Sequence, residues 1–101
     1  DFHAICASNR STADYITIAK QYQTVIISNI LILDKEKENE TRRFIAMIDE
    51  FYERKVKIII STEILYKDLY QGQKLVFEYK RTQSRLTEMA SEEYQKLAHI
   101  H

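Results

Sequence analysis

Two short apolar runs flank an amphipathic segment in the middle of the chain. The first run, TVIIS at Thr24–Ser28, is β-branched and does not alternate, which is typical of a strand buried on both faces. The second is VKIIIS at Val56–Ser61. Between them, apolar residues recur three or four apart from Phe44 to Tyr52, as on one face of a helix. We therefore predict a helix over Glu40–Arg54 and a βαβ unit with parallel strands and a right-handed crossover.

The segments before this unit and within it predict a first helix and a polar connection. Ser11 is a good N-cap, and Asp14 follows three residues later at the positive end of the helix. Apolar residues then recur at helical spacing as far as Tyr22. The charged segment Leu33–Glu40 is expected to be an exposed connection.

The segments after the unit predict a third strand and two short helices. KLVFEY at Lys74–Tyr79 alternates, as a strand with one wetter face does. RTQSRLTEMA and SEEYQKLAHI predict the helices, with Ser91 as N-cap of the second. The expected fold class is α/β: a small, mainly parallel sheet of about three strands with helices packed on it. At 101 residues, a single domain over 1–101 is expected.

The glycine count excludes two common nucleotide sites. The chain has one glycine, Gly72, and no proline. A Walker A loop needs several glycines so that backbone N–H groups can surround the phosphates, and a Rossmann fingerprint needs three. We therefore expect no cofactor bound by this chain alone and no ATP hydrolysis by it.

Charge and cysteine content restrict the possible partners and the cellular compartment. The 15 basic and 15 acidic residues cancel, so a nucleic-acid partner has little electrostatic support and none is expected. Cys6 is the single cysteine, which excludes an intrachain disulfide and fits a reducing cytosol. The apolar runs are too short for an integral membrane segment. Because the first residue is Asp1, we expect a fragment or a trimmed chain.

The stretch FIAMIDE looks like the acidic end of a Walker B strand, which binds Mg²⁺ in ATPases. Its final residues, Asp49 and Glu50, would then be a catalytic pair. The helical period gives a different interpretation, in which Phe44, Ile48 and Phe51 face the sheet and the two acids face solvent. The helical interpretation is favoured, so no catalytic residue is assigned.

Several longer stretches resemble one protein family. RRFIAMIDEFYERKVKIIISTE, LYQGQKLVFEYKRTQSRL and EMASEEY are similar to the C-terminal region of the ZapE-type AAA+ cell-division ATPases of bacteria, which have mitochondrial relatives. The resemblance runs from about Asp1 to Ile100 and is densest from Arg42 to Tyr94. The family usually has a proline after each of the first two strands, where this chain has NILIL and STEIL. These departures concern loop geometry more than fold.

The resemblance implies a larger, ATP-hydrolysing parent protein. Its Walker A, Walker B and sensor elements would precede Asp1, and ATP and Mg²⁺ would be its ligands. The parent would be cytoplasmic or associated with the inner membrane, and linked to the division-ring protein FtsZ. TVIIS, the helix and KIIIST also resemble a Walker B strand, helix and sensor strand, but Ser28 and Asn29 stand where the catalytic acids would be.

Two functions follow from the resemblance. In the first, this chain is a C-terminal domain that completes or regulates the ATPase module. In the second, it is a protein-interaction module that binds FtsZ or another division partner and has no role in hydrolysis. The expected partners include the upstream ATPase half, and self-association is expected through the apolar face that would meet that half.

Arg81 and Arg85 are the candidates for nucleotide sensing. They lie four apart at the start of a predicted helix, so they point the same way. AAA+ lids often place a cationic sensor there, and arginine suits this role because it is always charged and offers a planar fork of donors. The alternative is that Arg85 pairs with Glu88 on the helix surface.

Arg42 and Arg43 are candidates for an interface or phosphate contact. Cations near a helix N-terminus are slightly unfavourable, so each is expected to have a partner. That partner could be an acid of the absent half, a neighbouring subunit's phosphate, or Glu38, Glu40 or Asp49 nearby. A local or interdomain salt bridge is favoured over a phosphate contact.

Two other groups of reactive side chains carry weaker signals. His3, Cys6, His99 and His101 are of zinc-ligand types, but they lack a CxxC pair, and no metal site is assigned. Ser61 ends a predicted strand without a glycine elbow or a nearby histidine. We therefore interpret Ser61 as a helix cap.

Overall fold

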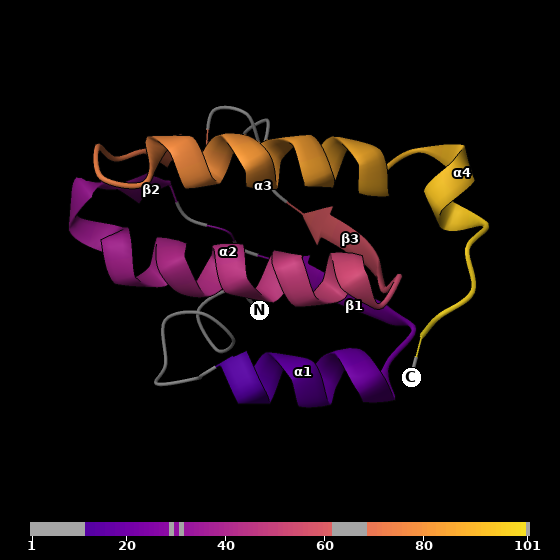
Figure 1. The fold of residues 1–101 in the computed structure, drawn as a ribbon. Helices are drawn as coiled ribbons and strands as arrows, with labels where there is room; N and C mark the ends of the chain where they lie inside the picture. The colour runs from indigo at the N-terminus through magenta and orange to yellow at the C-terminus, as the bar shows by residue number, and fades with distance from the viewer. Residues whose placement is uncertain (1–11, 29, 31, 62–68, 101) are drawn as a thin grey trace.

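The computed structural model describes residues 12–28, 30, 32–61 and 69–100. Helices α1 (Thr12–Gln21), α2 (Glu38–Glu53) and α3 (Val76–Met89) lie side by side in one layer with α2 in the middle, as Figure 1 shows. Strands β1 (Thr24–Ser28) and β3 (Lys57–Ser61) lie behind this layer. The α/β class is therefore confirmed.

The central βαβ unit has the predicted order. Strands β1 and β3 pair in parallel, with Thr24 opposite Lys57 and Ser28 opposite Ser61, and α2 is in the connection between them. Alternate residues point to opposite faces of a strand, so Ile27 is buried under the helices while Ile26 faces the other way and is exposed.

A second, smaller sheet replaces the expected third strand. Strand β2 (Leu33–Asp34) pairs in parallel with β4 (Tyr70–Gln71). The side chain of Asp34 then caps the short 3-10 helix η2 (Lys35–Lys37) by accepting a hydrogen bond from the backbone N–H of Glu36 over 3.0 Å. The segment Leu33–Glu40 is therefore structured, and it was wrong to expect a plain connection there.

The predicted strand at Lys74–Tyr79 is wrong, because α3 begins at Val76. The buried side chains of this region recur at helical spacing and continue past the end of the alternating run: Leu75, Tyr79, Thr82, Leu86 and Met89. One face of a long helix therefore explains the burial that a short strand was expected to provide. The two C-terminal helices are present, and the first is longer than expected.

Helix α2 buries one apolar face and ends in a tight turn. Phe44, Ile48 and Phe51 have no exposed surface, which confirms the predicted phase of the helix. At its end, Lys55 adopts a left-handed conformation with φ of 59°. The N–H of Val56 donates to the carbonyl oxygen of Phe51 over 2.9 Å. This is the bonding of a Schellman motif, and it allows β3 to follow α2 directly.

A short helix fixes the C-terminal part of the chain to the core. Helix α4 (Glu92–Gln95) begins at Ser91, whose hydroxyl accepts from the N–H of Tyr94 over 3.2 Å, so the predicted N-cap is confirmed. The buried hydroxyl of Tyr94 donates to the carbonyl oxygen of Val56 over 2.8 Å. This bond joins α4 to the turn between α2 and β3.

The single glycine permits a close approach between the starts of α2 and α3. The Tyr70 hydroxyl donates to a carboxylate oxygen of Glu38 over 3.1 Å and accepts from the N–H of Leu75 over 2.8 Å. A Cβ atom on Gly72 would lie 2.2 Å from Oε1 of Glu38. A side chain at position 72 would therefore displace this network.

No helix in the described part of the chain is long and apolar enough to cross a membrane.

Candidate functional site

The two candidate sensor arginines meet on one carboxylate. Arg81 and Arg85 lie on the side of α3 that faces α2, and both donate to Asp49. The Arg81 Nη2 atom lies 3.3 Å from Oδ2 of Asp49, and Arg85 contacts Oδ1. Asp49 is only partly exposed and faces α3, so the expectation that it simply faces solvent needs correction. We call Asp49, Arg81, Arg85 and Tyr52 the arginine cluster.

Arg85 is the inner member of the arginine cluster. Its guanidinium lies over the ring of Tyr52, 4.9 Å from the centroid, a geometry in which the cation is attracted by the ring. The Glu88 carboxylate accepts a hydrogen bond from the Tyr52 hydroxyl and raises the pKa of Tyr52, and burial adds to the effect. Arg85 therefore pairs with Asp49 and Tyr52, whereas the alternative expected it to pair with Glu88.

Arg81 is the outer member. Its side chain is 57% exposed, against 25% for Arg85. Asp49 supplies one negative charge beside the two guanidinium groups, and the Glu88 carboxylate bonded to Tyr52 supplies a second. Arg81 is the better placed of the two arginines to contact another group.

Arg42 and Arg43, the second pair of candidates, have different surroundings on the surface of α2. Arg43 lies 4.0 Å from Oε1 of Glu40, which is the local salt bridge that was favoured. Arg42 is exposed and lines a groove of about 230 Å³ between α2 and the start of α3. Asp49 and Glu78 line the same groove, so it joins Arg42 to the edge of the arginine cluster.

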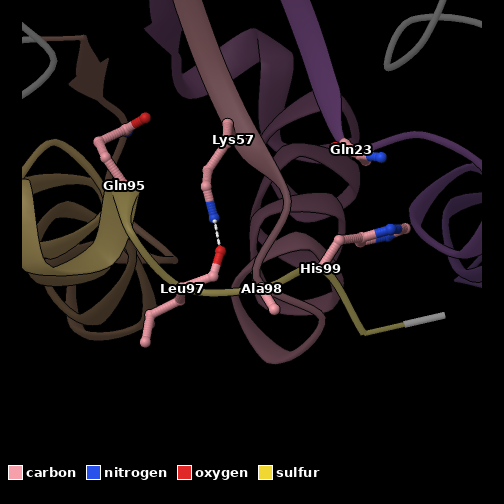
Figure 2. A pocket seen from close by; sticks show the side chains of 6 residues that line it. All are labelled: Gln23, Lys57, Gln95, Leu97, Ala98 and His99. Atoms are coloured by element: carbon pink, nitrogen blue, oxygen red, sulfur yellow. Dashed lines mark hydrogen bonds between the residues drawn. The ribbon is translucent and has the colours of Figure 1, made fainter.

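A larger pocket of about 440 Å³ lies at the amino ends of the strands. Figure 2 shows the Lys57 side chain reaching from β3 to the C-terminal segment, where it donates to the carbonyl oxygen of Leu97 over 2.6 Å. Burial, and then the nearby charge of Lys55, lower the pKa of Lys57. The His99 ring contacts the carbonyl oxygen of Ala19.

These contacts give the pocket a structural role. Its lining contains one cation and no carboxylate: Gln23, Lys57, Gln95, Leu97, Ala98 and His99. Ligands of open α/β sheets bind at the carboxyl ends of the strands, which is the opposite end. We therefore interpret Lys57 and His99 as anchors of the C-terminal segment.

Only part of the region at the carboxyl ends of β1 and β3 lies among the described residues. Ser28 and Ser61 end β1 and β3 side by side. Asn29 and residues 62–68 lie outside the described part, so the interpretation of Ser61 as a helix cap stays a prediction.

The described residues do not fit an ATP site of their own. Gly72 lies in a turn filled by Glu38 and Tyr70, and the arginine cluster is already engaged with Asp49. Within the described residues, no three His, Cys, Asp or Glu side chains gather as metal ligands. His3, Cys6 and His101 lie outside that part. Of the four candidate arginines, Arg42 and Arg81 have exposed side chains that are accessible to a phosphate.

The comparisons with known proteins give the family. Residues 1–98 match the model of the family described as AFG1-like ATPase. The chain is 44% identical over 99 residues to cell division protein ZapE of Escherichia coli strain K12, and equally to that of strain O157:H7. It is 29% identical over 125 residues to lactation elevated protein 1 homolog B of Danio rerio.

These alignments cover most of this chain but a small part of each relative. They span 98% of this chain and 26% of the E. coli proteins, and 92% of this chain and 25% of the D. rerio protein. The chain therefore spans about a quarter of the length of these relatives. No solved structure matches it. On its family match, the chain belongs to the AFG1-like ATPase family.

Proposed function

We propose that this chain is the C-terminal domain of a ZapE-like ATPase that acts in bacterial cell division in the cytoplasm. In this proposal it completes or regulates the part of the protein that hydrolyses ATP. The similarity to E. coli ZapE over nearly the whole chain supports the assignment. ATP and Mg²⁺ would be bound by the remainder of the protein.

The observation that carries the proposal is the layered arrangement of the arginine cluster. Arg85 is fixed between Asp49 and the Tyr52 ring, and Arg81 lies outside it with most of its side chain exposed. A guanidinium held at a defined place on a surface suits the recognition of an anionic group on a neighbouring unit. We assign Arg81 this contact, with Arg85 as its support.

The proposal predicts an effect on turnover in the full-length protein. Arg81→Ala should lower kcat for ATP by about tenfold or more, since a positioned cation acts mainly on charge that develops in the transition state. Lys80→Ala is the matched control, because Lys80 is the exposed neighbour on the same helix, and its turnover should not change. Steady-state turnover, nucleotide affinity and melting temperature are measured on each variant.

Arg85→Ala tests the supporting role of Arg85, as distinct from the direct contact assigned to Arg81. It should lower both turnover and melting temperature, because Arg85 also packs on Tyr52. If folded Arg81→Ala and Arg85→Ala proteins both hydrolysed ATP at the wild-type rate, nucleotide sensing by this cluster would be excluded.

The second candidate function is a protein-interaction module that binds FtsZ or another division partner. One observation favours it: Phe77 on the first turn of α3 is 85% exposed, beside the exposed Val76. Exposed aromatic side chains are frequent anchors of protein interfaces. Under this proposal, Phe77→Ser in the full-length protein abolishes partner binding and leaves ATP turnover unchanged. Lost turnover with retained binding would contradict it.

A further inference from the structure

A stack of aromatic and cationic side chains joins the C-terminal part of the chain to the arginine cluster. The rings of Tyr94 on α4 and Tyr52 on α2 are stacked, with their centroids 6.1 Å apart and an angle of 15° between their planes. The Arg85 guanidinium lies over the Tyr52 ring, and the Lys57 amino group lies 5.1 Å from the centroid of the Tyr94 ring. We call Lys57, Tyr94, Tyr52 and Arg85 the stack.

Tyr94 is fixed in the stack through its hydroxyl group. This hydroxyl donates to the carbonyl oxygen of Val56 and lies 3.3 Å from that of Phe51. Both carbonyl groups belong to the end of α2 and the turn after it. The bonded hydroxyl therefore sets where the Tyr94 ring lies, and the ring in turn limits where the stacked Tyr52 ring can lie.

The C-terminal segment, residues 91–100, depends on Tyr94 for its attachment to the core. Tyr94 is the single buried residue of this segment. The other attachments lie nearer the surface: Lys57 donates to the carbonyl oxygen of Leu97, and the N–H of Ile100 donates to that of Arg54 over 2.8 Å. A segment with little buried apolar surface opens at a lower free energy than the whole fold. The stack thus links the arginine cluster to a part of the fold that can open separately.

We propose that Tyr94 is a positioning residue for the arginine cluster. Docking of the C-terminal segment places the Tyr94 ring against Tyr52, and Tyr52 then holds Arg85. When the segment opens, the Tyr52 ring loses its stacking partner, so Arg85 is held less firmly. The consequence for ATP turnover rests on the proposed function, in which Arg85 supports Arg81. Under that function, displacement of the segment lowers turnover.

Arginine labelling of the full-length protein tests the inference. Phenylglyoxal modifies accessible guanidinium groups, and mass spectrometry of the peptides gives the rate at each position. Tyr94→Leu removes the ring and keeps an apolar side chain. We expect Arg85 to react about fivefold faster than in the wild type, because loss of one cation–π contact has an effect of about this size. Arg43 lies beside Glu40, outside the stack, and its rate should not change.

Three further variants complete the test. Tyr22→Leu is the same substitution at an exposed tyrosine, and it should leave the Arg85 rate at the wild-type value. Lys57→Met loosens the C-terminal segment without altering a fully buried side chain, and it should also accelerate labelling of Arg85. In the Tyr52→Leu background, Tyr94→Leu should add no further acceleration, because its effect passes through Tyr52.

Two outcomes would overturn the inference. The first is an unchanged Arg85 rate in folded Tyr94→Leu protein, or in Lys57→Met protein where Tyr94→Leu does not fold. The second is an acceleration by Tyr94→Leu that persists in the Tyr52→Leu background, since that would indicate general loosening of the fold. Turnover is measured on the same variants, and kcat should fall while KM for ATP stays constant. Faster labelling with unchanged kcat would support the positioning of Arg85 and contradict the proposed function.

Discussion

At the scale of single residues, Asp49 holds the structure of the candidate site together. It accepts from arginines on a different helix. Arg81 and Arg85 could be predicted to share one side of a helix, because four residues make about one turn. Their acceptor could not be predicted. Which residue of α2 faces them depends on how two helices pack, and no local sequence spacing records that geometry.

Asp49→Asn is expected to lower the free energy of unfolding by about 1 kcal/mol, since partly exposed ion pairs contribute about 0.2–1 kcal/mol each. Glu50→Gln is the matched control on the next residue and should change it by less than about 0.5 kcal/mol. Urea unfolding at low and high salt measures both. The Asp49 effect should shrink in high salt, because salt screens surface charges. Equal effects of the two variants would contradict the role of Asp49.

At the scale of elements, the confirmed predictions were those in which the local sequence pattern fitted only one type of secondary structure. The β-branched runs gave β1 and β3, and the apolar stripe around Phe51 gave α2. The start of α3 was missed because Leu75, Phe77 and Tyr79 alternate as a strand would. The helical pattern becomes visible only when it is followed through the polar Thr82, which is buried. Tertiary packing thus overrode a local preference for strand.

Phe51→Ala tests the packing of α2 on the sheet. Phe51 is fully buried, so truncation should cost about 3–5 kcal/mol. Phe77→Ala is the same substitution at an exposed position of α3 and should cost less than about 0.5 kcal/mol. Chemical denaturation of the two variants gives the comparison. A larger loss for Phe77→Ala would mean that α3 packs by a different face.

At the scale of the whole molecule, buried tyrosines make the stability of the fold depend on pH. Tyr79 and Tyr94 are buried, and burial raises the pKa of each well above 10.0. Burial also raises the pKa of Tyr70, and its bond to Glu38 adds to this. These hydroxyls lie in the contacts between helices and at α4, so their ionisation bears on most of the fold.

The protein should therefore lose stability above about pH 10. The unfolded chain releases tyrosine protons near the ordinary pKa while the folded chain retains them, so unfolding is favoured as pH rises. Lys57 acts in the opposite direction, because its lowered pKa in the folded state costs stability that is recovered as pH rises. Tyrosines outnumber it, and the net effect is a loss.

Melting temperature measured from about pH 8 to pH 11.5, together with tyrosinate absorbance, checks this prediction. In Tyr79→Phe, one of the raised groups is missing, so the decline with pH should be shallower than in the wild type. A melting temperature that stays constant to the top of this range would contradict the prediction. It would show that the tyrosines ionise as readily in the folded protein as in the unfolded chain.

The parallel pairing of β1 with β3 has a consequence for how the chain folds. Residue 24 pairs with residue 57, so no hairpin can nucleate the sheet, and the ends of a long loop must first be brought together. Prior formation of α2 shortens that search, because the helix spans most of the loop and presents its apolar face to both strands. Folding should thus be limited by docking of the strands onto a nascent α2, with α4 added afterwards through Tyr94.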